Sequence, residues 1–197
     1  MPSSPASPLA PRAGETLLTG WGRTAPSTAT VERVTSVADV QEAVAKATSR
    51  GLLARGLGRS YGDAAQSGGA TVLDLAALAQ IDLDREAGTV TVGAGVSLDA
   101  LLKVIVPQGF LVPVTPGTRM VTVGGAIAAD VHGKNHHVEG TFGSHVSALT
   151  LIDGRGVEHR LGPEQEPEAF WATVGGMGLT GVMTEATFDL IPSSSSP

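Results

Sequence analysis

Glycine is the residue that most constrains how this chain can fold. The sequence holds 26 glycines and 12 prolines in 197 residues, together about 19% against roughly 12% in average proteins, and most of the excess is glycine. Many glycines lie in four segments, at 55–63, 116–129, 130–137 and 175–181. Because glycine lets the backbone turn freely and approach a ligand closely, these segments predict loops whose backbone can meet a ligand.

The composition excludes several classes of protein. Hydrophobic residues make 42% of the chain and charged residues 16%, which indicates a well-buried core and excludes a wholly disordered chain. There is no cysteine, so disulfide scaffolds, thiol nucleophiles and cysteine metal sites are excluded. The net charge is −6 and lysines and arginines form no run, so we expect no nucleic-acid partner.

The two ends of the chain have a different composition from its middle. Residues 1–16 are rich in proline, serine and alanine and lack the apolar core of a signal peptide, so they predict a disordered leader. Residues 192–197 read as a linker-like tail. We therefore expect the folded domain at 17–191. Without a signal or an apolar span of about 20 residues, a cytoplasmic location is expected.

Helical and alternating patterns follow one another along the middle of the chain, which predicts an α+β fold of mixed sheets flanked by helices. Ser36 with Asp39 resembles a capping box, and Ser97 is a second cap. Hairpins are expected where turns containing glycine separate two apolar runs. The expected helices are 37–50, 98–106 and 168–174, and the expected strands are 52–54, 71–75, 81–84, 89–92, 146–152, 157–160 and 182–190.

Three of the glycine segments could hold a cofactor. Segment 55–63 could form a nest of backbone N–H groups for a pyrophosphate, or a plain surface loop. In segment 116–129, small residues would let a helix N-terminus pack against a planar or phosphate-bearing ligand, or simply against a sheet. Segment 175–181 could hydrogen-bond the edge of a heterocycle, although alone it indicates only a turn.

Segment 130–137 is the densest group of titratable residues. A metal site is disfavoured, because its histidines lack a carboxylate at ligand spacing and the adjacent His136 and His137 would face apart in a strand. Hydrogen bonding beside a bound ring fits better. A Rossmann nucleotide site at 92–97 is rejected, because Leu98 stands where its third glycine is required.

Six motifs, in order, resemble the FAD-binding domain of the vanillyl-alcohol-oxidase (PCMH-type) flavoproteins, and the similarity runs from Leu18 to Ile191. The motifs are T-G-W-G-R-T at 19–24, A-R-G-L-G-R-S-Y-G-D at 54–63, P-G-T-R at 116–119, V-T-V-G-G-A-I-A at 121–128, H-G-K-N-H-H at 132–137 and F-W-A-T-V-G-G at 170–176. Within that family they look most similar to the enzymes that oxidise decaprenylphosphoryl-β-D-ribose. The resemblance implies a two-lobed domain with FAD as cofactor.

The resemblance also implies which residues bind FAD and which stand beside the flavin and the substrate. His132, Tyr61 and Lys134 are the catalytic candidates, with purely structural hydrogen bonding as the alternative. Arg59 stands at the place beside Ser60 where many relatives carry a flavin-linking histidine, so FAD is expected to be non-covalent. The implied cofactor residues are Ala54, Arg55, Gly56, Leu57, Gly58, Arg59, Ser60, Tyr61, Gly62, Asp63, Ala64, Pro116, Gly117, Thr118, Thr122, Val123, Gly124, Gly125, Ala129, Asp130, Val131, His132, Asn135, Gly178, Leu179, Thr180, Gly181, Val182 and Met183.

The implied reaction is hydride transfer from C2′ of a lipid-linked ribose to the flavin, which serves arabinan precursor synthesis in actinobacterial cell walls. An NADH-dependent keto-reductase is the implied partner, and a membrane-associated or periplasmic location would follow. Family members continue into a substrate domain, which is missing here and which a separately encoded chain could supply. The alternatives are a soluble sugar or alditol oxidase of the same fold and a flavin-binding fragment without catalysis.

Overall fold

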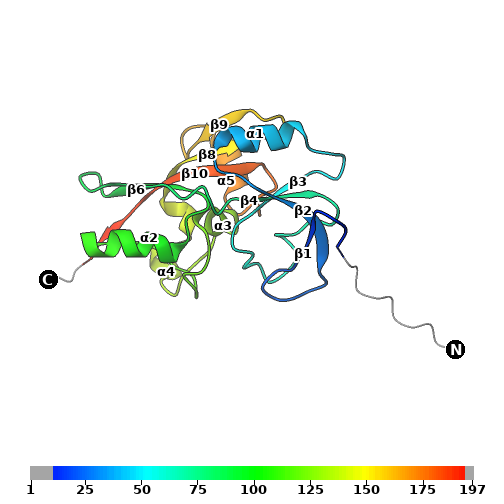
Figure 1. The fold of residues 1–197 in the computed structure, drawn as a ribbon. Coiled ribbons are helices and arrows are strands. Elements are labelled where there is room, and N and C mark those ends of the chain that lie inside the picture. The colour runs from blue at the N-terminus through cyan, green and yellow to red at the C-terminus, as the bar shows by residue number, and fades with distance from the viewer. Residues whose placement is uncertain (1–10, 194–197) are drawn as a thin grey trace.

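The computed structural model describes residues 11–193 and arranges them as two larger sheets, one two-stranded sheet and flanking helices (Figure 1). Residues 1–10 of the expected leader and 194–197 of the expected tail lie outside the described residues. The strands are β1 (Glu15–Leu18), β2 (Ser27–Arg33), β3 (Leu52–Arg55), β4 (Thr71–Asp74), β5 (Ile81–Asp84), β6 (Thr89–Gly93), β7 (Phe110–Leu111), β8 (Val146–Ile152), β9 (Glu158–Leu161), β10 (Val182–Asp189) and β11 (Ile191–Pro192). The helices are α1 (Val37–Ala45), α2 (Leu98–Ile105), α3 (Val123–Ala128), α4 (His136–Glu139) and α5 (Pro167–Thr173), with 3₁₀ turns at Val106–Gln108 and Phe142–His145.

The two larger sheets form two lobes, and β7 pairs with β11 in a third, two-stranded sheet. The first has the order β1-β2-β4-β3, in which β2 and β3 run parallel to the central β4. The second has the order β5-β6-β10-β8-β9 and is antiparallel throughout. Figure 1 shows α1 on one side of the second sheet and α2 and α3 on the other. The predicted α+β class with mixed sheets is confirmed.

Strand β4 connects the cores of the two lobes. Successive side chains of a strand point to opposite faces. Accordingly, Val72 packs with Leu18, Ala29 and Leu53 in the small core of the first lobe, whereas Leu73 belongs to the large core of the second. This alternation holds the two lobes against each other, so a cavity between them has fixed walls.

Helices α1 and α2 begin at the predicted caps. The Ser36 hydroxyl accepts a hydrogen bond from the Asp39 amide at 3.2 Å and the Asp39 carboxylate accepts one from the Ser36 amide at 3.1 Å, which completes the capping box. The Ser97 hydroxyl accepts from the Ala100 amide at 3.1 Å. Both helix starts are therefore confirmed.

Other expectations need correction. His136 and His137 lie in the one-turn helix α4 and not in a strand, because the amides of Val138 and Gly140 bond back to the carbonyls of Asn135 and His136. Strands β1 and β2 were not expected from the sequence. Ordered strands also reach slightly beyond 17–191, since β1 begins at Glu15 and β11 includes Pro192.

Among residues 11–193, no helix has both the length and the apolar character that a membrane crossing requires.

Candidate functional site

A cavity of about 820 Å³ lies between the two lobes, within the range of roughly 300–1,000 Å³ that is usual for cofactor and ligand pockets. The end of β3 and the loop after it, residues 54–65, form one wall. Residues 116–131 form a second wall, and residues 173–183 close the end, with Met183 of β10 among them. Glycine-rich segments far apart in the sequence therefore meet around one space.

The loop at 56–65 has an unusual number of backbone donors without a protein partner. Within residues 11–193, none of the amides of residues 57–65 donates a hydrogen bond to a protein acceptor. Backbone N–H groups in folded proteins are nearly always paired with protein, water or ligand. A run of unpaired N–H groups in a cavity wall is therefore suited to an anion such as a phosphate.

Glycine is required at this wall because the loop packs directly on α3. A Cβ at Gly56 would lie 2.3 Å from the Thr122 hydroxyl oxygen. A Cβ at Gly124 would lie 2.9 Å from the Cβ of Ala94. Thr122 cannot yield, because it is 3% exposed and its hydroxyl caps α3 by accepting from the Gly125 amide at 3.1 Å. The glycines therefore set the width of the cavity.

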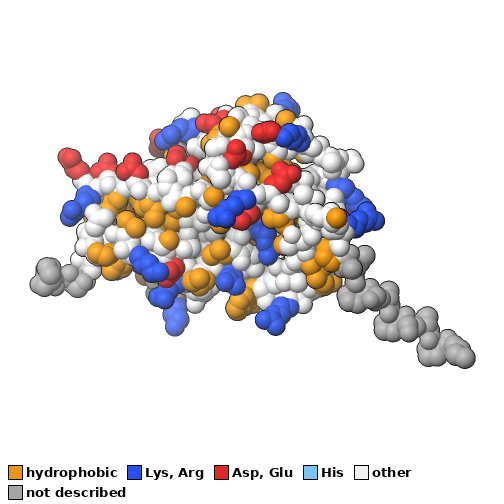
Figure 2. All heavy atoms as spheres, in the orientation of Figure 1, with side chains coloured by type: hydrophobic (Ala, Val, Ile, Leu, Met, Phe, Trp, Pro, Cys, Tyr) orange, Lys and Arg blue, Asp and Glu red, His pale blue; other side chains and the backbone are white. Residues whose placement is uncertain are grey.

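The charges around the cavity are mostly positive. Arg55, Arg59 and a single carboxylate, that of Asp63, lie in the lining, whereas acidic side chains gather elsewhere, for example over the β5–β6 hairpin (Figure 2). The Arg59 guanidinium lies 4.9 Å from the centre of the Trp21 ring and donates to the Met120 carbonyl at 3.1 Å. Arg59 thus joins three segments at the cavity.

The far end of the cavity is shaped by the 175–181 loop. The amides of Gly175 and Met177 donate to the Ile127 and Ala128 carbonyls at 3.0 and 2.8 Å, so this loop caps the C-terminal end of α3. Met177 has a φ of 55°, a left-handed backbone conformation that costs a side chain energy. The strain lies at the cavity wall, where Met177 is part of the lining.

Most of the predicted cofactor residues lie in the cavity wall. The ones that line it are Ala54, Arg55, Gly56, Leu57, Gly58, Arg59, Ser60, Tyr61, Gly62, Asp63, Ala64, Pro116, Gly117, Thr118, Thr122, Gly124, Gly125, Ala129, Val131, Gly178, Gly181 and Met183. Their contact with FAD stays a prediction.

Seven predicted cofactor residues are not in the lining, and most have other contacts. Val123 and Val182 are buried in the core. The Asp130 carboxylate accepts from the Gly143 amide at 3.0 Å, and the Thr180 hydroxyl pairs with that of Thr173 at 3.0 Å. The Asn135 side-chain amide donates to the Pro113 carbonyl at 2.9 Å, Leu179 is 80% exposed, and His132 is exposed as well.

The three catalytic candidates do not lie together in the cavity. Tyr61 lines it and is 79% exposed. His132 and Lys134 are exposed and follow Val131, which lines it. The His132 ring contacts the His136 ring at 5.6 Å between centroids. Among the described residues, no group of three or more histidine, aspartate or glutamate side chains is arranged to hold a metal ion.

Several lining residues were not proposed from the sequence. Trp21 lies in the T-G-W-G-R-T motif, and the glycines on either side of it pack against the backbone of 60–62, where a Cβ would come within 2.6 Å of carbonyl oxygens. That motif was the available signal for Trp21. Val121, Ala128 and Thr173 lie in the quoted motifs at 121–128 and 170–176, and Met120 and Met177 lie in the glycine segments 116–129 and 175–181, so the same kind of signal was available for them. The remaining lining residues carry no local signal: Ala65, Leu75 and Ala94.

Comparison with known proteins gives consistent results. The model of the FAD binding domain family matches residues 28–162. The decaprenylphosphoryl-β-D-ribose oxidase of Mycolicibacterium smegmatis is 50% identical over 181 residues, which cover 89% of this chain and 39% of that protein. An alditol oxidase of a Streptomyces species is 30% identical over 181 residues, covering 90% of this chain and 43% of that protein.

A solved structure of 6-hydroxy-D-nicotine oxidase from Arthrobacter nicotinovorans matches with a TM-score of 0.79 and 25% identity, covering 88% of this chain and 39% of that one. The chain thus spans about two fifths of the length of these relatives. The flavoprotein family and the cofactor expected from the motifs are confirmed: this chain belongs to the FAD binding domain family, and its cofactor is FAD.

Proposed function

We propose that the chain is the FAD-binding part of an oxidoreductase that oxidises the 2′-hydroxyl of decaprenylphosphoryl-β-D-ribose to the 2′-keto sugar. The observation that carries this proposal is the 50% identity over 181 residues to the mycobacterial decaprenylphosphoryl-β-D-ribose oxidase. In that role the protein would contribute to arabinan precursor synthesis for the cell wall.

The cavity fits FAD in size and in chemistry. Its volume of about 820 Å³ is large enough for a dinucleotide, and FAD carries a diphosphate that needs several donors. The unpaired amides of 57–65 and the nearby guanidinium group of Arg59 supply them. When bound, FAD supplies a flavin ring that accepts a hydride, while the protein contributes orientation and electrostatics.

We propose that this domain holds FAD without a covalent bond. The chain has no cysteine, and none of its five histidines lines the cavity. Arg59 stands in the wall beside Ser60, where it is held by Trp21 and Met120. An arginine is not a group to which flavins are attached in this family, so the cofactor is expected to dissociate when the protein is denatured.

The side chains near the open part of the cavity are proposed to orient the sugar. The phenol of Tyr61 can both donate and accept a hydrogen bond, and its exposure leaves it free to meet a substrate. His132 and Lys134 are proposed as further groups that hold the sugar hydroxyl or receive its proton. They would act from the loop that follows Val131.

The partners of the reaction are part of the same proposal. The substrate is a lipid-linked sugar, so turnover would take place at a membrane surface. The keto sugar would pass to an NADH-dependent keto-reductase. Because the chain covers 39% of the mycobacterial relative, contacts to the substrate are also expected from a substrate domain or from a separately encoded chain.

A second candidate is an FAD-dependent oxidase of soluble alditols. The observation in its favour is the 30% identity to the Streptomyces alditol oxidase over 90% of this chain. A third reading, a flavin-binding fragment without catalysis, remains as the outcome in which no sugar reduces the bound flavin.

The test begins with the visible spectrum of the purified chain mixed with FAD, before and after acid precipitation. Yellow protein that releases its FAD on precipitation supports the site and its non-covalent character. Anaerobic addition of decaprenylphosphoryl ribose should then bleach the flavin. Bleaching by free alditols, with peroxide formed in air, would favour the second candidate, and protein that takes up no FAD would contradict the assignment of the cavity.

A further inference from the structure

Arg55 lies at the point where β3 ends and the cavity loop begins, and its guanidinium bonds to two separate segments. Nη1 donates to the carbonyl of Ala65, at the other end of the loop. Nη2 donates to the carbonyl of Thr19 at 2.8 Å, just before the Trp21 segment. One side chain therefore joins the beginning of the loop, its end and a neighbouring strand connection.

The planar fork of the guanidinium matters for this arrangement. Nη1 and Nη2 belong to one rigid group, so the two carbonyl oxygens are fixed relative to each other as well as to Arg55. Gly58, with a φ of +62°, passes directly over the group, and a Cβ at this position would lie 2.2 Å from Nη2. The loop is thus wrapped around the guanidinium.

The charge of Arg55 is not balanced by an ion pair. Among residues 11–193, no carboxylate lies within salt-bridge distance of Arg55, which is half-buried. Burial lowers the pKa of the Arg55 guanidinium and the charge of Asp74 opposes that shift. The hydrogen-bond partners of the group are two carbonyl oxygens and not a carboxylate, which indicates that its main effect is the geometry it imposes on the backbone.

We propose that Arg55 is a positioning residue, whose guanidinium fork holds residues 56–65 in the shape that lines the cavity before FAD binds. This inference rests on the proposed FAD site and changes the expected role of Arg55, from direct contact with the cofactor to support of the loop that makes the contact. The loop is then already ordered when the protein has folded, so FAD binding does not carry the entropic cost of ordering it.

The sequence contains a matched control. Arg33 ends β2 and Arg55 ends β3, and both lie opposite Asp74 in the register of β4. Arg33 is exposed, and no hydrogen bond or ion pair of its side chain is present in the described part of the chain. The two arginines therefore share a position in the sheet and differ in the fork contacts.

The experiment compares Arg55→Lys and Arg55→Gln with Arg33→Lys and Arg33→Gln in the 197-residue chain. The FAD dissociation constant is measured by quenching of flavin fluorescence, and amide hydrogen exchange is measured without FAD. Both Arg55 variants should weaken FAD binding by about tenfold or more, since each loses charge-assisted bonds of the fork. They should also speed exchange of the Trp21 and Gln66 amides, which donate to the Ser60 and Asp63 carbonyls of the loop, while both Arg33 variants stay within about twofold.

Four results would overturn the inference. Arg55→Lys binding as tightly as the unaltered chain while Arg55→Gln binds weakly would assign the effect to charge and not to the fork. Normal binding by both variants, or unchanged exchange of the Trp21 and Gln66 amides, would remove the positioning role. If neither variant folds, FAD binding and amide exchange are measured for Arg55→Ala with added ethylguanidinium. Restored affinity and restored protection from exchange would support the proposal, and a lack of restoration would overturn it.

The failure of the proposed function would look different. An unaltered chain that binds no FAD would refute the FAD site, whereas faster exchange confined to the Trp21 and Gln66 amides in the Arg55 variants would still establish that Arg55 positions the loop.

Discussion

The core of the second lobe and the loops around the cavity are built in opposite ways. In the core, Phe142, Phe170 and Phe188 are at most 2% exposed and the strands pair their backbone groups with one another. Around the cavity, glycines take the place of side chains and the amides of 57–65 have no protein partner. The core is therefore the main source of stability and the loops are the main source of binding. Changes in the core should alter the free energy of unfolding, and changes in the loops should alter the affinity for FAD.

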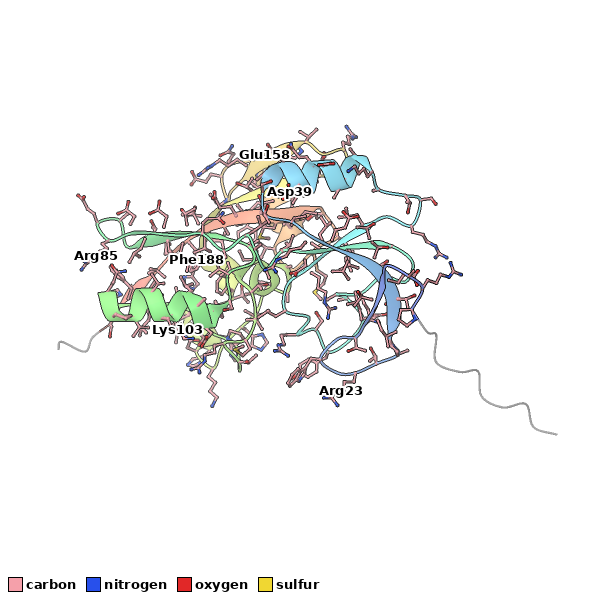
Figure 3. All side chains as sticks on the ribbon, in the orientation of Figure 1. Arg23, Asp39, Arg85, Lys103, Glu158 and Phe188 are labelled. Carbon is pink, nitrogen blue, oxygen red and sulfur yellow. The ribbon has the colours of Figure 1, made fainter. Side chains whose placement is uncertain are left out.

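The largest effect on stability is expected from Phe188→Ala. Phe188 lies in the interior on β10 (Figure 3), fully buried and 5.2 Å from the Phe142 ring centroid. The variant should lose about 3–5 kcal/mol of unfolding free energy through lost burial and the cavity left behind. Urea unfolding measures this loss. The folded fraction should bind FAD with unchanged affinity, and weaker binding would show that the two regions are coupled.

For Gly56→Ala we expect the opposite result, in which FAD affinity falls and the free energy of unfolding changes little. The new Cβ would meet the Thr122 hydroxyl at 2.3 Å, which pushes the loop away from α3 and should weaken FAD binding by about tenfold or more. Fluorescence titration with FAD measures the affinity. Gly154→Ala, in the β8–β9 hairpin where a Cβ has open space, is the control. Equal affinity of both variants would contradict the tight loop packing.

A gain in stability is expected from Met177→Gly. Met177 has a φ of 55°, and glycine should relieve the strain and raise the unfolding free energy by about 1 kcal/mol. Thermal unfolding measures the gain. Met120→Gly is the matched control, because Met120 is similarly exposed, lines the same cavity and has no positive φ. A gain in both variants would mean that backbone strain is not the cause.

The smallest effect is a pH dependence at the start of α1. The pKa of Asp39 lies below its ordinary 3.8, chiefly because the Thr35 amide donates to its carboxylate. A lowered folded-state pKa means that the ionised carboxylate contributes stability above the ordinary pKa and loses it as the pH falls through the folded value. Asp39→Asn should therefore lower the melting temperature at neutral pH, and this difference from the unaltered chain should shrink as the pH falls below 3.8 and through the lowered folded-state pKa. A difference in melting temperature between the variant and the unaltered chain that stays the same at every pH would argue against a role of the ionised carboxylate.

Local signals made part of the fold predictable. The caps at Ser36 and Ser97 and the hairpin turns at Gly88 and at 153–154 depend on residues a few positions apart, and each lies where it was expected. Strand β2 has no such signal, because of its seven residues only Ala29 is buried. It becomes a strand by pairing with β4, and α1 and β3 lie between these two strands in the sequence.

The candidate site likewise contains residues that local sequence signals mark and residues that they do not. Glycine motifs mark the cavity walls at 54–65 and 116–125, because close packing restricts which residue can stand there. Leu75 and Ala94 reach the cavity only through the arrangement of the sheets. Asp130 and Thr180 belong to the right motifs, but their side chains are occupied by Gly143 and Thr173, which no spacing rule indicates.

The cavity wall includes Trp21 near one end of the described chain and Met183 near the other. It can therefore form only after β10 has inserted between β6 and β8. FAD binds the completed fold and not its partly folded precursors, so the cofactor concentration becomes a determinant of stability, adding about 2.7 kcal/mol at one hundred times the dissociation constant. The melting temperature of this protein should rise with added FAD, and a cell short of flavin would hold less of it folded.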